Sequence, residues 1–151
     1  MDPKPELLVF ALMSATGASK ACAAHGDAAT VAVLEAWYAL VAAAAEGVGG
    51  MVVKLLGDGA LVTFPVARAR DAVAALRGLQ GSGTALWKRF DARCAVQVKV
   101  GAGSLMTGLF GAPGRERFDV YGHALNELFK DPWGDFAVTP AVTALLGGPP
   151  A

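Results

Sequence analysis

The sequence predicts an α+β fold in which helices pack on one face of an antiparallel sheet. Short apolar segments that suit strands occur in pairs joined by glycine-rich or polar turns. Segments with apolar residues at helical spacing separate these pairs, so the expected order is strand, helix, two strands, helix, two strands, helix, strand. Antiparallel hairpins mixed with helices in this order favour a ferredoxin-like core.

The first segments supply a strand and a helix. Residues 6–13 form a nearly continuous apolar run, which is typical of a strand buried on both faces. A loop of small residues, 14–19, is expected to follow. Asp27 is then expected to cap a helix that reaches about residue 46. Its buried stripe is predicted from apolar residues at helical spacing, namely Val31, Leu34, Tyr38 and Val41.

Residues 49–64 predict a hairpin, because two aliphatic and β-branched runs flank a Gly-Asp-Gly turn. Lys54 lies on the first strand and Asp58 at the tip of the turn. A cation and a carboxylate would therefore be held at the edge of a sheet.

The second half predicts another helix and the remaining strands. Val73 and Leu76 face inward in the second helix, residues 66–79, and Arg68, Arg70 and Arg77 face solvent. The two glycines of residues 81–83 are expected to end this helix before a less regular amphipathic segment. The later elements are a strand at 94–100, its return strand at 104–110, a polar loop at 111–117, a helix at about 122–130, a strand at 135–139 and a helical turn from Pro140.

Composition indicates a single domain, residues 1–151, with an apolar face that a partner or a second copy would cover. Hydrophobic residues make up 54% of the 151 residues, charged residues 17%, and the mean hydropathy is +0.45. Thirteen basic and thirteen acidic residues cancel, which argues against a nucleic acid ligand.

The sequence has no pattern typical of a membrane span or a signal peptide, and this bears on the compartment in which the protein is expected. The longest apolar run, residues 36–45, is too short and too rich in alanine to predict a membrane span, and the first residues lack the pattern of a signal peptide. Cys22 and Cys94 have neither Cys-x-x-Cys spacing nor a nearby histidine, so both are expected to be reduced thiols. A cytoplasmic protein without a zinc site is therefore expected.

Four segments, in this order, resemble the catalytic domain of class III adenylyl and guanylyl cyclases. They are the strand at residues 7–11, the hairpin with Lys54 and Gly57-Asp58, the segment from Gly103 through Gly108 to Gly111, and the segment from Asp119 through Gly122 to Asn126. The likeness extends from about residue 6 to about residue 146. It implies a dimer, either with a second copy or with another cyclase-like chain, whose active site lies at the two-fold interface.

The resemblance also implies residue roles for ATP. Lys54 and Asp119 match the pair that reads adenine, where the lysine donates to N1 and the aspartate accepts from the amino group. Asn126 matches the asparagine that orients the ribose. Lys130 stands where the family has an arginine for the phosphates, and lysine lacks the bidentate fork. Asp58 matches a carboxylate that holds Mg²⁺ or Mn²⁺.

Leu12 departs from the family pattern. The first strand of the family ends in Phe-x-Asp, and this aspartate shares two metal ions with the hairpin aspartate, but here the sequence reads Phe10-Ala11-Leu12. Asp58 alone can hold one metal ion through substrate oxygens. Cyclisation relies on metal to activate the ribose hydroxyl and neutralise the triphosphate, so we expect a loss of roughly a thousandfold or more in rate.

Three functions remain open at this stage. The chain could be a degenerate cyclase domain that serves as a dimerising regulatory or nucleotide-binding module. It could be a half-enzyme whose Lys54, Asp119 and Asn126 complete the site of a partner adenylyl cyclase. It could also be an unrelated ferredoxin-like protein-interaction module.

Each site residue also has an ordinary structural interpretation. Asp58 suits a tight turn, Lys54 an edge strand, Asp119 and Asn126 the capping of a short helix, and Lys130 the last turn of that helix. His25 and His123 lack metal-ligand spacing and are expected to be structural or solvated. The large aromatic residues expected in the core or an interface are Trp37, Trp87, Phe90 and Trp133.

Overall fold

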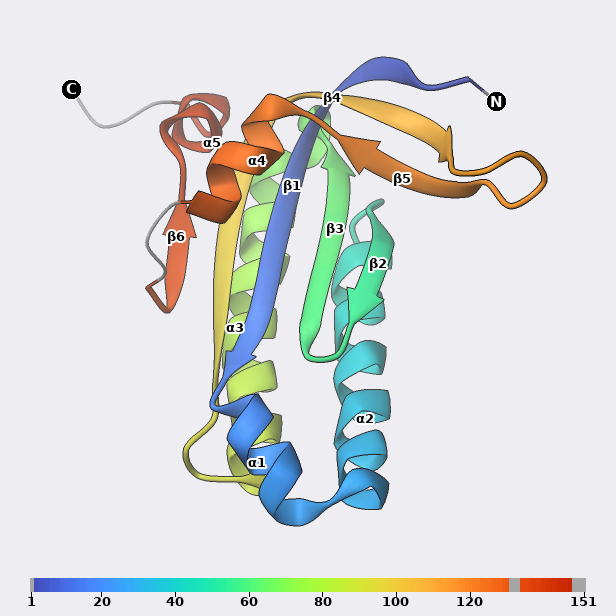
Figure 1. The fold of residues 1–151 in the computed structure, drawn as a ribbon. Helices are drawn as coiled ribbons and strands as arrows, with labels where there is room; N and C mark the ends of the chain where they lie inside the picture. Colours follow the sequence, from blue (N-terminus) through green and yellow to red (C-terminus); the bar gives the residue numbers. More distant parts are fainter. Residues whose placement is uncertain (1, 131–133, 148–151) are drawn as a thin grey trace.

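The fold is built around two long neighbouring strands, β1 (Lys4–Thr16) and β4 (Ala95–Phe110) (Figure 1). In the computed structural model, which describes residues 2–130 and 134–147, these strands belong to a six-stranded sheet of order β2-β3-β1-β4-β5. The other strands are β2 (Met51–Leu56), β3 (Gly59–Pro65), β5 (Arg117–Tyr121) and β6 (Phe136–Val138). All pairs are antiparallel except that of β6 with β4, which is parallel.

Helices separate the strand pairs as the sequence predicted. They are α1 (Ala18–His25), α2 (Asp27–Glu46), α3 (Ala69–Phe90), α4 (His123–Lys130) and α5 (Pro140–Leu145), with a short 3₁₀ turn, η1 (Val66–Arg68), before α3. The predicted α+β class with an antiparallel sheet is confirmed. The hairpin, α4, β6 and the final helical turn all lie where they were expected.

The two faces of the sheet carry separate cores. Alternate residues of β1 such as Val9 and Ala11 pack against α2 and α3, together with Val142 of α5. The residues between them, such as Phe10 and Leu12, pack on the opposite face, where Leu125 and Leu128 of α4 cover them. Most helices thus share one face, as predicted, and α4 covers part of the other.

The loop predicted at residues 14–19 is wrong, because β1 continues to Thr16 and α1 follows at once. Ser14, Ala15 and Thr16 pair with Gln97, Val96 and Ala95 of β4, so the ladder extends the strand. Gly17 then turns the chain into α1 with a φ of 75°, a conformation that glycine adopts at little cost.

The extent of α2 was predicted correctly, but its cap was not, and its buried stripe was predicted only in part: Val41 is buried, and Leu34 and Tyr38 are partly buried against the core. Gly26 occupies the cap position, and Asp27 begins the helix without a capping hydrogen bond. The buried residues are Val33, Trp37, Val41 and Ala45, whereas Val31 is 54% exposed. The many alanines of α2 blur the apolar pattern, so the large Trp37, which packs at the centre, decides the orientation.

The predicted helix break at residues 81–83 is wrong, and α3 continues to Phe90. Gly83 lies against the Trp37 ring, and a Cβ on it would come within 2.5 Å of a ring carbon. The glycine therefore allows α2 and α3 to pack closely. Tertiary contacts of this kind outweigh the low helix propensity of glycine.

The predicted return strand at residues 104–110 is also wrong, because it continues the preceding strand as β4. The whole of β1 pairs with β4, from Lys4 opposite Thr107 to Thr16 opposite Ala95. Gly101 gives room to Phe10, since a Cβ there would lie 2.7 Å from a carbon of that ring. The strand that returns along β4 is β5.

The predicted burial of the large aromatic residues is confirmed for those that the structure describes. Trp37 and Trp87 are fully buried, Phe90 is partly buried, and Trp133 lies outside the described residues. Cys22 and Cys94 are both free, and burial raises the pKa of the Cys94 thiol.

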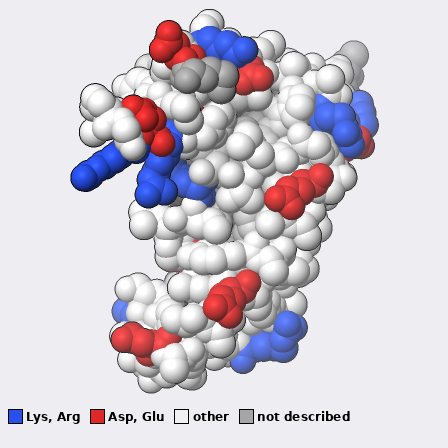
Figure 2. Space-filling model, turned by 90° about the vertical axis from the view of Figure 1, so that its right-hand side faces the viewer, with Lys and Arg blue, Asp and Glu red and all other residues white. Residues whose placement is uncertain are grey.

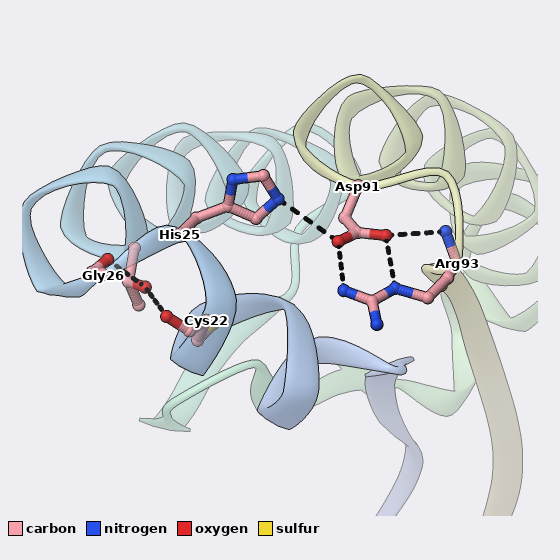
Figure 3. Close-up of polar contacts among 6 residues, drawn as sticks. Cys22, His25, Gly26, Asp91 and Arg93 are labelled. Atoms are coloured by element: carbon pink, nitrogen blue, oxygen red, sulfur yellow. Dashed lines mark hydrogen bonds and ion pairs between the residues drawn. The ribbon is translucent and has the colours of Figure 1, made fainter.

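A polar cluster joins α1 to the end of α3 (Figure 3). The carboxylate of Asp91 accepts hydrogen bonds from Arg93 at 2.9 and 2.7 Å, and His25 Nε2 lies 3.2 Å from its Oδ2. The His25 ring also contacts Phe90, with ring centroids 4.7 Å apart. His25 is therefore structural, which was one of the two roles expected for it.

Among the described helices, α2 has 20 residues and an 18-residue window with a mean hydropathy of 1.7, so it is long and apolar enough for a membrane span, which residues 36–45 alone did not indicate. Core helices share these features, and one stripe of α2 packs against α3 and the sheet. Within the structure, 22% of this window is buried, so packing accounts for only part of its apolar composition.

Candidate functional site

The tip of the β2–β3 hairpin is fastened to β1 and α2 by three hydrogen bonds. The backbone N–H of Ala15 donates to Asp58 Oδ2 at 2.8 Å. Trp37 Nε1 donates to the backbone oxygen of Asp58 at 2.9 Å, and the Tyr38 hydroxyl donates to that of Gly57 at 2.6 Å. The Asp58 carboxylate therefore has a structural partner. Trp37 and Tyr38 were predicted only as packing residues, and the sequence pattern did not indicate these hydrogen bonds.

Lys54 and Asp119, which lie far apart in the sequence, meet as an ion pair. Lys54 Nζ is 3.0 Å from Asp119 Oδ2, and the two side chains are 55% and 36% exposed. A β-bulge at residue 53 shifts the register of β2 just before Lys54. The N–H of Val120 donates to the other Asp119 oxygen at 2.8 Å, which fixes the carboxylate. The structure thus brings together the two residues predicted to act as a pair.

A cavity of about 330 Å³ lies between the second half of β1, the hairpin and the end of α4. Lys54 stands in its wall, and most of the wall is aliphatic or aromatic. The lining residues are Leu12, Met13, Ser14, Lys54, Leu56, Gly59, Ala60, Leu61 and Phe129. Leu12, the residue at which the family pattern has a metal-binding aspartate, therefore lines an apolar cavity.

The residues of this region do not fit a pair of divalent cations. Mg²⁺ binds oxygen ligands, and Asp58 offers one carboxylate, one oxygen of which is already hydrogen-bonded. The described residues contain no group of three or more His, Cys, Asp and Glu side chains that could hold a metal ion. The donor set of this chain alone thus differs from that of a two-metal site.

Asn126 and Lys130 lie on the exposed part of α4. The Asn126 side chain has no hydrogen-bond partner among the described residues, and its backbone N–H bonds to Gly122 within the helix start. Lys130 pairs with Glu127 at 3.4 Å, and His123 lies 3.7 Å from the same carboxylate. No polar contact in the described part of the chain connects Asn126 or Lys130 to Lys54, Asp58 or Asp119.

Lys99 is a buried cation that the sequence analysis missed. It is 1% exposed, lies opposite Leu12 in the β1–β4 ladder, and its Nζ donates to the backbone oxygen of Leu128 at 2.8 Å. Because α4 covers this face, Lys99 lies beneath the end of that helix, where a cation is favourable.

Comparisons with solved structures identify the fold. The chain superposes on the guanylyl cyclase Cya2 with a TM-score of 0.85 and 16% identity, covering 96% of this chain and 80% of that one. For the adenylyl cyclase CyaB from P. aeruginosa the TM-score is 0.87 at 16% identity, with coverages of 97% and 83%. A dimeric guanylyl cyclase domain of the RhoGC fusion protein from Blastocladiella emersonii gives 0.75 at 11% identity, with coverages of 95% and 85%.

These likenesses establish a fold shared with the catalytic domains of class III nucleotide cyclases. At such identities they establish the fold alone. Comparison of the sequence with protein-family models and with curated proteins finds no match.

Proposed function

We propose that this chain is a class III cyclase-like domain that acts as a dimerising regulatory or nucleotide-binding module and does not cyclise ATP by itself. The observation that carries the proposal is the Lys54–Asp119 ion pair, because the resemblance to adenylyl cyclases assigns these two residues to adenine recognition. It lies in the same region as a cavity whose wall contains Leu12 in place of a carboxylate.

The base-recognition part of the proposal follows from donors and acceptors. A lysine ammonium donates hydrogen bonds, and an ionised aspartate accepts them. Adenine presents an acceptor at N1 and a donor at its amino group, whereas guanine presents a donor at N1 and an acceptor at O6. Lys54 and Asp119 therefore suit adenine.

The chain lacks a carboxylate at position 12, and this absence is the reason to expect no cyclisation by the chain alone. Metal-assisted attack of the ribose hydroxyl needs the charge of the metal ions close to the reacting oxygens. Asp58 is tied to Ala15, and Leu12 offers no oxygen. We therefore expect any cyclisation by this chain alone to be very slow.

Exposed apolar side chains support the dimeric part of the proposal. Large hydrophobic residues are exposed on β1, β2, β4 and β5, namely Leu7, Met51, Leu55, Met106, Leu109 and Tyr121. Figure 2 shows that charged residues are sparse on the side of the molecule on which β2 and α2 lie. Exposed apolar side chains on such a surface favour association. A cytoplasmic location stays a prediction.

A half-enzyme is the second candidate, and the state of Asn126 favours it. An exposed amide without a described partner is free to contact the substrate in a site shared with another chain. In that case Lys54, Asp119 and Asn126 would complete the site of a partner that supplies both metal aspartates.

Two measurements test these proposals. Light scattering at high micromolar concentration should give a dimer, and a monodisperse monomer would contradict the dimeric module. The chain should then be mixed with a cyclase domain in which its own adenine-reading lysine is replaced. Restored formation of cyclic AMP, lost with Asn126→Ala but kept with the neighbouring His123→Ala, would support the half-enzyme instead. If the chain is monomeric and binds no nucleotide, a protein-interaction module built on this cyclase-like fold remains.

A further inference from the structure

The cavity between β1, the hairpin and α4 has the shape and lining of a small-molecule site. Its volume of about 330 Å³ lies at the lower end of the range usual for ligand pockets. Ala60, Leu61 and Leu12 form buried parts of its wall. Leu56 and Phe129 also line it, and they are 83% and 59% exposed. Two large apolar side chains thus remain in contact with water at the edge of an apolar cavity.

We propose that this cavity binds a small amphipathic monocarboxylate, with the apolar chain in the cavity and the carboxylate on Lys54 Nζ. The inference goes beyond the proposed function, because it requires neither nucleotide nor metal nor a second chain.

The single positive charge in the cavity wall favours a ligand with one negative charge. Of the described residues that line the cavity, Lys54 alone carries a charged side chain, and Ser14 is the only other residue with a polar side chain. A lysine ammonium has three N–H donors, and the structure shows one directed to Asp119. The remaining donors can form charge-assisted hydrogen bonds with a carboxylate, which are stronger than those with a neutral acceptor.

The same lining disfavours more highly charged ligands. A triphosphate or a hydrated divalent cation would lose water against leucine, methionine and phenylalanine side chains without gaining enough polar partners. A long apolar chain with one terminal charge places its apolar part against this wall and its charge at Lys54, which is itself 55% exposed and so stays in contact with water.

Titration calorimetry with decanoate, without nucleotide or Mg²⁺, tests the proposal on the full chain. Decanol serves as a probe with the same chain and no charge. We expect one decanoate per chain. Lys54→Met should weaken decanoate binding by roughly tenfold or more and leave decanol binding within about twofold, because only the charge-assisted hydrogen bonds are lost. Lys130→Met, which changes an exposed lysine that does not line the cavity, is the matched control and should change neither.

The apolar wall is tested at its exposed edge, where substitutions leave the core intact. Leu56→Ser and Phe129→Ser should weaken both decanoate and decanol, whereas Val31→Ser, at an exposed position on α2, should weaken neither. Thermal unfolding followed by circular dichroism confirms that each variant is folded.

Several results would overturn the inference. These are the absence of decanoate binding by the folded wild-type chain, an equal effect of Lys54→Met and Lys130→Met, or no effect of the two edge substitutions. A wild-type dimer that ignores decanoate and dissociates with Phe129→Ser would assign the cavity to a second copy. Binding of ATP without binding of decanoate would overturn this inference and leave the proposed function standing.

Discussion

The base side and the metal side of the candidate site are built in opposite ways. On the base side, Lys54 and Asp119 keep a complementary donor and acceptor at the surface. On the proposed metal side, Leu12 offers an aliphatic side chain in the cavity wall, and the Asp58 carboxylate accepts a hydrogen bond from the backbone N–H of Ala15. One fold thus holds a complementary donor and acceptor at its surface beside a region with few oxygen ligands.

The two regions also differ in what they contribute to stability. The Asp58 carboxylate satisfies an N–H at the buried position 15, so it supports the fold. The Lys54–Asp119 pair is half-exposed, and pairs of this kind add little to stability. Asp58 therefore has a clear role in the stability of the fold, whereas the Lys54–Asp119 pair contributes little to it.

The largest expected effect concerns catalysis. The isolated chain with ATP and Mg²⁺ or Mn²⁺ should form cyclic AMP at least about a thousandfold more slowly than a cyclase with both metal aspartates, because one carboxylate is missing. Chromatographic detection of cyclic AMP measures this. Turnover at an ordinary cyclase rate that disappears with Asp58→Ala would contradict the comparison.

The second effect is on folding. Asp58→Ala should lower the free energy of unfolding by about 1–3 kcal/mol, because the Ala15 N–H loses its acceptor. Asp58→Asn should cost less, since its amide oxygen can still accept. Urea unfolding measures both, with Glu35→Ala, an exposed carboxylate on α2, as control. An Asp58→Ala protein as stable as the control would remove the structural role of this carboxylate.

The third effect is smaller. Lys54→Met and Asp119→Asn should each change the free energy of unfolding by less than about 1 kcal/mol, because the ion pair is half-exposed. A double-mutant cycle in urea should give a coupling of roughly 0.2–1 kcal/mol. A coupling of several kcal/mol would make this pair a structural element like Asp58.

The last effect concerns a carboxylate away from both regions. Hydrogen bonds from the Arg93 side chain and backbone, with a further contribution from His25, hold the pKa of Asp91 well below its usual value of 3.8. A carboxyl whose pKa is lower in the folded protein stabilises it above the unfolded pKa, and this stabilisation is lost as the pH falls. The stability difference between wild type and Asp91→Asn should therefore shrink as the pH falls below about 4. A difference that stays constant from pH 6 to pH 2 would contradict this, as acid unfolding experiments can determine.

Local patterns predicted much of the fold, and long-range packing explains the errors. The hairpin and the pairing of Lys54 with Asp119 follow from turn chemistry and from the resemblance in segment order. The continuity of α3 depends on the contact of Gly83 with Trp37, and that of β4 on the full-length pairing with β1. Neither contact is visible in a local window of sequence.

The site shows the same division. The sequence located Leu12, Lys54 and Asp58, but the apolar cavity depends on Phe129 of α4, which lies far from them in the chain. The buried Lys99 and the hydrogen bonds of Trp37 and Tyr38 to the hairpin tip also arise from tertiary packing. The prediction that Lys54 and Asp119 read adenine stays a prediction.

Calorimetric titration of the wild-type chain with ATP and GTP, each with and without Mg²⁺, tests most directly whether the base side is retained and the metal side lost. ATP should bind weakly but more tightly than GTP, since each mismatched polar contact costs about 1–3 kcal/mol, and Mg²⁺ should not strengthen the binding. Lys54→Glu should reduce the preference for ATP. Equal or undetectable binding of both nucleotides, or tight binding that requires Mg²⁺, would contradict the account.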